Sequence, residues 1–230
     1  MLVQFIVLAI GAYLLGSVPA AYLAVKWARG IDIRTVGTGK VGAANVLSAG
    51  GPKWLAIPVA LFDIGKGALA VWAAQLIGLN AAQQVTVGLF AIGGHNWPIY
   101  LRFKSSGRGI FASLGVISML SWKLGLIVLI LPYLFAPIKQ VAFGVFVALI
   151  SIPFFGYFLA GPLGIKEKLP ISLGLAALSA MALLKRVVAR RTELSKKVPL
   201  GTVFINRLLF DRDIADRRLW INKASANRGQ

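Results

Sequence analysis

Apolar stretches of near-membrane length recur along this chain and restrict it to folds that can cross a lipid bilayer. Apolar residues make up 58% of the sequence, charged residues make up 14%, and the mean hydropathy is +0.78. A transmembrane helix needs about 20 mainly apolar residues and satisfies its own backbone polar groups. The sequence therefore predicts an all-α, polytopic membrane protein with about seven transmembrane helices. The expected spans are residues 2–25, 54–77, 82–101, 109–121, 123–138, 141–160 and 169–185. The fourth and fifth are shorter than a perpendicular span, so the alternatives are that one is re-entrant or that the pair forms a tight buried hairpin.

The distribution of basic residues predicts how these spans are oriented. Among the loops between the expected spans, one set carries most of the Lys and Arg residues, namely Lys26, Arg29, Arg34, Lys40, Lys53, Arg102, Lys104, Arg108 and Lys139. Loops rich in Lys and Arg tend to stay in the cytoplasm, so we expect an external N-terminus and a cytoplasmic C-terminus. The first apolar run has neither a basic flank nor a clear cleavage site, so we expect it to remain as a helix. This pattern predicts a multi-pass protein of the cell (inner) membrane.

The chain divides into a helical membrane domain and a basic tail. The expected units are a transmembrane domain at 1–185, with cytoplasmic active-site loops at 26–53 and 101–109, and a cytoplasmic tail at 186–230. Between Lys185 and Gln230, twelve Lys and Arg residues against four acids give a net charge of +8. Within this tail, Val203–Ile221 interleaves apolar residues with arginines. That pattern predicts either an interfacial helix on the inner leaflet or an ordinary solvated basic tail.

Charge and composition also limit the partners. The net charge of +18 lies mostly on the side predicted to be cytoplasmic, where anionic lipid headgroups attract basic segments. We therefore expect membrane phospholipids as partners and no nucleic acid. The chain has no cysteine and one histidine, which excludes disulfides and disfavours a zinc site built by the protein. We expect no metal and no cofactor.

Two charges stand inside the second expected span. Asp63 and Lys66 are the only charged residues in 54–77, where a charge at the bilayer centre costs about 2.5–3.5 kcal/mol. Their i, i+3 spacing places both on one helix face. The pair therefore predicts either a polar functional site that opens toward the cytoplasm or a self-neutralising structural pair.

The first cytoplasmic loop has the composition of an anion site. Gly37, Gly39 and Gly42 match G-x-G-x-x-G, but no strand precedes them, so a dinucleotide fingerprint is excluded. Glycines nevertheless let backbone N–H groups converge on an anion, and neighbouring residues supply hydroxyl, amide and charge. The candidate ligands are Arg34, Gly37, Thr38, Gly39, Lys40, Gly42 and Asn45. The alternative is a flexible turn between two helices.

The loop after the third span repeats this pattern. It brings glycines, hydroxyls and cations to the start of the next helix, where the helix dipole favours an anion. The candidates are His95, Asn96, Lys104, Ser106, Gly107 and Arg108. His95 beside such a site is either a proton acceptor or a satisfied structural residue.

Together these segments resemble the bacterial acyl-phosphate-dependent glycerol-3-phosphate acyltransferases. The resemblance is carried over roughly residues 1–115 by Gly16–Pro19, the Asp32–Asn45 loop, Asp63–Gly67, Gly94–Pro98 and Phe103–Lys104. It implies a seven-helix enzyme that moves a fatty acyl group from acyl phosphate to glycerol 3-phosphate, giving lysophosphatidate. Neither acyl-CoA nor acyl carrier protein is then required.

The resemblance also implies roles for individual residues. Thr38, Lys66, Lys104 and His95 are the catalytic candidates for such a reaction, with Thr38 in the place of a family serine. The proton acceptor is either His95 or the substrate's own phosphate, since the resemblance requires no protein base. One phosphate would be held by Thr38, Gly39, Lys40 and Asn45, and the other by Lys66, Lys104 and Arg108, while Asp63 would orient Lys66.

The chain departs from the family pattern at several positions. Lys40 replaces an asparagine, Ala44 replaces a threonine, and Arg108 replaces a lysine. In the tail, Gly201 and Phe204 stand where the family has a histidine and an asparagine. These departures keep open the alternative of a non-catalytic relative that binds phospholipid or acyl phosphate. The intramembrane Asp63 and Lys66 allow a third interpretation, a small-anion transporter.

Overall fold

The structure, a computed structural model, is built from helices. It describes residues 1–36, 39–48, 53–104, 107–189, 193–196, 198–216 and 219–220, and no strand occurs in these ranges. The α-helices are α1 (Leu2–Ser17), α2 (Ala20–Arg29), α3 (Ala43–Ser48), α4 (Ala56–Leu76), α5 (Ala81–Asn96), α6 (Ile110–Leu120), α7 (Trp122–Ile130), α8 (Val141–Phe158), α9 (Lys168–Val187), α10 (Glu193–Lys196) and α11 (Leu200–Phe210). Short 3-10 helices are η1 (Ile33–Thr35), η2 (Lys53–Leu55), η3 (Ile99–Leu101) and η4 (Leu131–Phe135). The all-α expectation is confirmed for the described residues.

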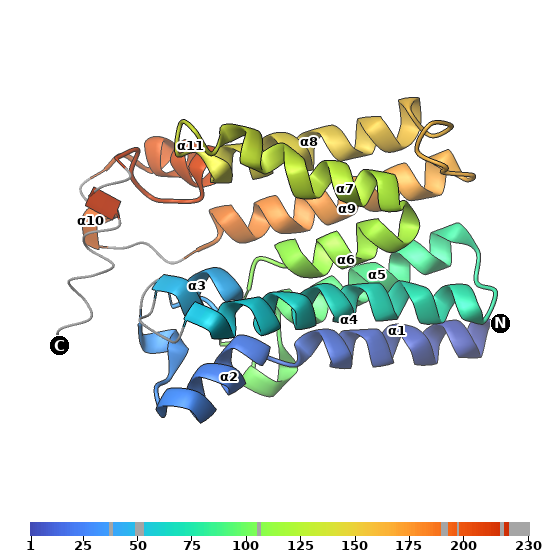
Figure 1. Cartoon of the computed structure of the whole chain (residues 1–230), viewed down its shortest axis with the longest axis horizontal. Helices are drawn as coiled ribbons and strands as arrows, with labels where there is room; N and C mark the ends of the chain where they lie inside the picture. The colour runs from blue at the N-terminus through green and yellow to red at the C-terminus, as the bar shows by residue number, and fades with distance from the viewer. Residues whose placement is uncertain are drawn as a thin grey trace.

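The longer helices run roughly parallel to one axis, as Figure 1 shows. Within the described ranges, four segments are long and apolar enough to cross a membrane: Leu2–Arg29, Ala56–Leu76, Val141–Phe158 and Lys168–Val187. The shorter apolar helices Ile110–Leu120 and Trp122–Phe135 lie among them. The N-terminus lies at one end of this bundle, whereas α2, α3, α10 and α11 gather at the opposite end (Figure 1).

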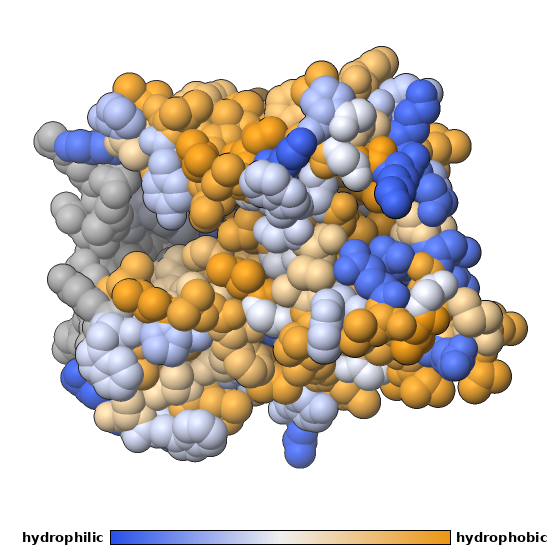
Figure 2. Space-filling model, turned by 45° about the vertical axis from the view of Figure 1, so that its right-hand side comes forward, coloured by the Kyte–Doolittle hydropathy of each residue, from blue (hydrophilic) through white to orange (hydrophobic). Residues whose placement is uncertain are grey.

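The outer surface of the bundle is apolar. Side chains such as Leu61, Phe154 and Leu173 are 58–63% exposed, although water would disfavour them. Figure 2 shows broad hydrophobic surface interrupted by smaller hydrophilic patches. Such a surface suits lipid rather than water, in agreement with the membrane class expected from composition.

The first span is not one continuous helix. Val18 adopts an extended backbone before Pro19, and the chain breaks there into α1 and α2. Proline has no backbone N–H and disfavours helical geometry in the preceding residue. The expectation of a single helix over 2–25 is therefore wrong at this point. The third span, expected at 82–101, likewise ends earlier, at Asn96.

Glycine allows α4 and α6 to pack backbone against backbone. A Cβ on Gly67 would collide with the carbonyl of Ala112, and one on Gly115 would collide with the carbonyl of Ile64. Helix axes approach this closely only where small residues meet. This contact holds Asp63 and Lys66 on α4 against the start of α6.

The tail folds back onto the bundle. Helix α11 packs against α8 and α9, and Val203, Asn206 and Arg207 are buried. It ends at Phe210, because Asp211 takes a left-handed conformation with φ of 58°. The expectation of one continuous helix over 203–221 is therefore wrong, because α11 ends at Phe210. The alternative of a solvated tail does not describe α11, which has buried residues. The expected boundary at 185/186 falls inside the last turn of α9, which continues to Val187.

Candidate active site

Three polar side chains meet inside the bundle. The Nζ of Lys66 lies 2.8 Å from Oδ1 of Asp63 and 2.7 Å from Nδ1 of His95, and Asp63 and Lys66 are only 3% and 2% exposed. Nδ1 of His95 is also 3.4 Å from Oδ1 of Asp63. The shared helix face expected for Asp63 and Lys66 is confirmed, and His95 joins them from α5.

The contact between lysine and histidine determines which ring nitrogen carries hydrogen. A lysine ammonium has three donors and no acceptor. With Lys66 charged, we assign Nδ1 of His95, at 2.7 Å, as the acceptor, which places the hydrogen of a neutral ring on Nε2. Nε2 points toward Gly107, because a Cβ on Gly107 would collide with it. In this arrangement His95 offers a donor toward the 107–109 segment.

The helix break at Val18 contributes to this cluster. Its carbonyl lies 3.5 Å from Nζ of Lys66, at the long limit of a hydrogen bond. Pro19 follows Val18 and cannot donate the backbone hydrogen bond of a regular helix. The motif residues Val18 and Pro19 thus shape the surroundings of Lys66 rather than supply a reacting group.

A cavity of about 480 Å³ opens beside the three residues. Asp63 and His95 line one part of it, and apolar side chains of α6, α7, η4 and α8 line another. The apolar part comprises Ile110, Phe111, Leu114, Val128, Leu129, Pro132, Tyr133, Val141, Ala142 and Val145. A space with one apolar and one polar part suits an amphipathic ligand such as an acyl chain with an anionic head.

Cations from three separate segments line the polar part of the cavity. They are Lys40, Arg108 and Arg186, which we call the cationic rim. The pKa of the Lys40 amine is lowered to about 8, chiefly by burial; Asp213 opposes this shift, and the positive charges of Arg186 and Arg207 contribute to it. Arg186 was not among the predicted site residues, because the sequence places it in the basic tail, whereas it lies in the last turn of α9.

Asn45 holds the first loop in shape. Its side-chain amide donates to the carbonyls of Ile33, Val36 and Lys40 at 3.1, 3.2 and 2.9 Å. Asn45 also lines the cavity, together with Gly42. One buried amide therefore fixes the loop that presents Lys40 to the cavity.

Other candidates lie away from the cavity lining. Arg34 pairs with Asp32 at the surface, and this guanidinium lowers the pKa of the Asp32 carboxyl. Lys104 is exposed, and Asn96 is fully buried with its amide against Gly109. Gly39, within the first loop, has a positive φ of 67°. Gly37, Thr38 and Ser106 lie outside the described residues, so their expected roles stay predictions.

Comparison with known proteins identifies the family. The family model described as glycerol-3-phosphate acyltransferase matches residues 6–195. The chain belongs to the glycerol-3-phosphate acyltransferase family. A relative from Dehalococcoides mccartyi, named glycerol-3-phosphate acyltransferase 5, is 42% identical over 222 residues, covering 96% of this chain and 94% of the relative.

Solved structures of the same family share the fold. The glycerol 3-phosphate form of PlsY (YgiH), an integral membrane glycerol 3-phosphate acyltransferase, has a TM-score of 0.73 at 27% identity and covers 95% of this chain and 98% of its own. The lysophosphatidic acid form has a TM-score of 0.71 at 26% identity and covers 96% of this chain and 99% of its own. Membership makes this chain a membrane acyltransferase that acylates glycerol 3-phosphate in phospholipid synthesis.

Proposed function

We propose that this glycerol-3-phosphate acyltransferase uses acyl phosphate as its donor and releases lysophosphatidate and inorganic phosphate. The observation that carries the proposal is the cavity of about 480 Å³, which joins an apolar space to the cationic rim and to Asp63 and His95. An acyl phosphate requires this combination, because its chain needs apolar walls and its head needs cations. The acceptor, glycerol 3-phosphate, brings a second phosphate into the site. Because a buried anion needs a compensating charge, this phosphate also requires cations nearby.

The reaction exchanges the mixed-anhydride bond of the acyl phosphate for an ester bond. The acceptor hydroxyl oxygen attacks the acyl carbonyl carbon, the carbon–oxygen bond to phosphate breaks, and the hydroxyl proton leaves with the phosphate. Negative charge develops on the carbonyl oxygen during this step, so fixed donors nearby stabilise it. The donating Nε2 of His95, held by Lys66, is our candidate for that role, and the leaving phosphate itself takes the proton.

The residue roles follow from position in the cavity. Lys40 and Arg108 neutralise phosphate, and Arg108 precedes the N-terminus of α6, where backbone N–H groups add to the attraction. Lys66 acts on the cavity through His95, since Lys66 itself is behind the lining. Asn45 positions the first loop. Lys104, which is exposed, is proposed to attract anions to the entrance rather than to touch the acyl group.

The site would face the cytoplasm of the cell (inner) membrane. We propose seven spans, in which Leu2–Arg29, α4, α5, α6, α7 with η4, α8 and α9 each cross. An odd number of spans places the termini on opposite sides, and the two ends of the bundle in Figure 1 support this arrangement. Basic loops on the site's side then give an external N-terminus and a cytoplasmic C-terminus.

Donor choice tests the proposal. The purified protein in detergent is supplied with glycerol 3-phosphate and either palmitoyl phosphate or palmitoyl-CoA, and lysophosphatidate is measured by mass spectrometry. We expect product from palmitoyl phosphate alone. Product from palmitoyl-CoA alone would refute the donor assignment, and absence of product from both, beside an active relative, would refute the catalytic reading of the cavity.

A further inference from the structure

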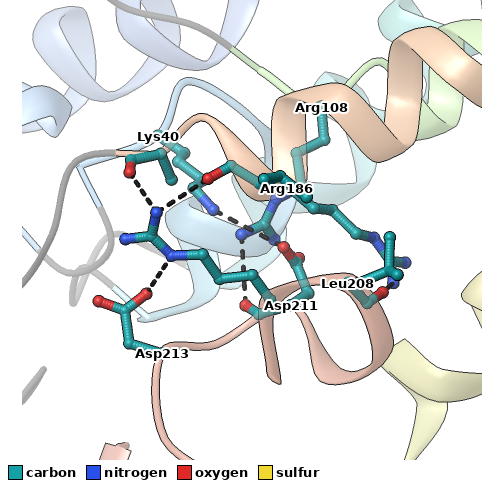
Figure 3. A network of polar contacts seen from close by, with 9 residues as sticks. Lys40, Arg108, Arg186, Leu208, Asp211 and Asp213 are labelled. Atoms are coloured by element: carbon teal, nitrogen blue, oxygen red, sulfur yellow. Dashed lines mark hydrogen bonds and ion pairs between the residues drawn. The ribbon is translucent and has the colours of Figure 1, made fainter. Parts of the chain in front are cut away.

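A carboxylate from the tail lies against the cationic rim. Asp211 lines the same cavity and forms an ion pair with the Arg108 guanidinium, while its Oδ1 is 3.9 Å from Nζ of Lys40. Nη2 of Arg108 also approaches the Asp211 backbone carbonyl at 3.4 Å. Figure 3 shows this network where the turn after α11 meets the end of α9.

The network leaves several buried polar atoms without hydrogen bonds. These are Oδ1 of Asp211, Nε of Arg108 and Nε of Arg186, and Arg186 is only 2% exposed. Buried polar groups are normally satisfied, and unsatisfied ones call for an explanation. A carboxylate offers two oxygens, whereas a phosphate monoester offers three strong acceptors and a larger charge. Two donors of the rim, Nε of Arg108 and Nε of Arg186, therefore stay without an acceptor even though Asp211 lies in the cavity.

Two arginines hold the turn that carries Asp211 in place. Arg186, in the last turn of α9, donates to the Leu208 carbonyl of α11 at 2.9 Å. Arg207, on α11, donates in return to the carbonyls of Val187 and Ala189 at the end of α9. Each arginine thus caps the C-terminus of the other helix, where cations are favoured.

Asp211 does not belong to the matched part of the family model. That match ends at residue 195, before α11 begins at Leu200. The Dehalococcoides relative, by contrast, aligns over 96% of the chain. The contact between Asp211 and the cationic rim is therefore made by a residue that lies C-terminal to the part of the chain matched by the family model.

We propose that Lys40, Arg108 and Arg186 form a binding site for a phosphate monoester, and that the Asp211 carboxylate occupies it until a substrate phosphate displaces it. This proposal rests on the proposed function, because it takes the bound phosphate to be that of acyl phosphate or of glycerol 3-phosphate. A phosphate and a carboxylate close to the same guanidinium repel each other, so binding at the rim requires Asp211 to withdraw. Asp211 thereby weakens phosphate binding.

Asp211→Asn tests this competition without changing the backbone. Asparagine, like aspartate, tolerates the left-handed conformation observed at φ of 58°, and its side chain has nearly the same size. Asp216→Asn is the matched control, because it removes the same charge from an exposed position of the same tail. The probe is inorganic phosphate, whose dissociation constant is read from the concentration dependence of the thermal midpoint of the full-length protein in detergent.

The outcomes separate the proposal from its alternatives. We expect Asp211→Asn to bind phosphate roughly tenfold more tightly than the parent protein, within the range typical of coupled binding, while Asp216→Asn is unchanged. Unchanged affinity in Asp211→Asn would overturn the proposal, because Asp211 would not compete. Weaker binding would also overturn it, since Asp211 would then orient the rim for its ligand. The readout needs no acyl donor, so failure of the donor assay leaves this test valid.

Discussion

The buried Asp63–Lys66 pair makes a prediction in which stability and activity separate. In Lys66→Met the Asp63 carboxylate loses an ammonium at 2.8 Å, in a site that is 3% exposed. Removing one partner of a buried pair costs about 3–5 kcal/mol, because the other charge is left without compensation. For a chain of this size that corresponds to a fall of about 6–20 °C in thermal midpoint. Asp63→Leu should fall by a comparable amount.

The double variant Asp63→Leu/Lys66→Met removes both charges and should recover most of the lost stability. Replacing a buried ion pair by apolar residues of similar size is often neutral or stabilising. All three variants should lose turnover: the two that lack Lys66 remove the partner that orients His95, and Asp63→Leu removes the carboxylate that positions Lys66. Thermal midpoints in detergent and lysophosphatidate formation are measured on the same preparations. A double variant with parental turnover would show that the pair is purely structural, and single variants with parental midpoints would refute the energetic argument.

Three further predictions concern the first loop and the helix packing. Because burial lowers the pKa of Lys40 to about 8, its positive charge is present below that pH and lost above it. The KM for glycerol 3-phosphate or acyl phosphate should therefore rise above about pH 8, and Lys40→Arg should flatten the profile if the assignment holds. Asn45→Ala should lower kcat/KM at least tenfold and cost about 1–3 kcal/mol, because three loop carbonyls lose their donor, as turnover and thermal unfolding would show. Gly67→Ala should destabilise the protein by about 1–3 kcal/mol, because the added methyl group would collide with the Ala112 carbonyl. Gly65→Ala is the control, since a methyl group there meets open space and should not destabilise the protein. Equal thermal midpoints for the two variants would contradict the packing of α4 against α6.

The sequence alone predicts two parts of the site, namely the Asp63–Lys66 pair and the two loops that bring glycines and cations to it. Asp63 and Lys66 are three residues apart on one helix, so their shared face follows from helix geometry alone. The glycine-rich composition and charge of the two loops predicted anion binding, and Lys40, Gly42, Asn45, Gly107 and Arg108 do line one cavity. The burial of His95 against Lys66 required the packing of α4 against α5, which no local pattern encodes.

What the sequence did not predict depends on contacts between distant segments. The sequence places Arg186 in the tail because it follows an apolar run. In the structure it lines the cavity together with Lys40 of the first loop and Arg108 of the loop after the third span. Asp211 reaches Arg108, 103 residues earlier in the chain, only because α11 folds back onto α8 and α9. A basic, partly apolar segment has the same composition whether it lies on a membrane or against its own protein.

The most direct test of the central claim is the stoichiometry of the reaction. Purified protein is given palmitoyl phosphate and glycerol 3-phosphate, and lysophosphatidate and inorganic phosphate are measured in the same time course. The account predicts one phosphate released for each lysophosphatidate formed, with phosphate release dependent on glycerol 3-phosphate. Phosphate release at the same rate without glycerol 3-phosphate, or no lysophosphatidate from this donor, would contradict acyl transfer at this cavity.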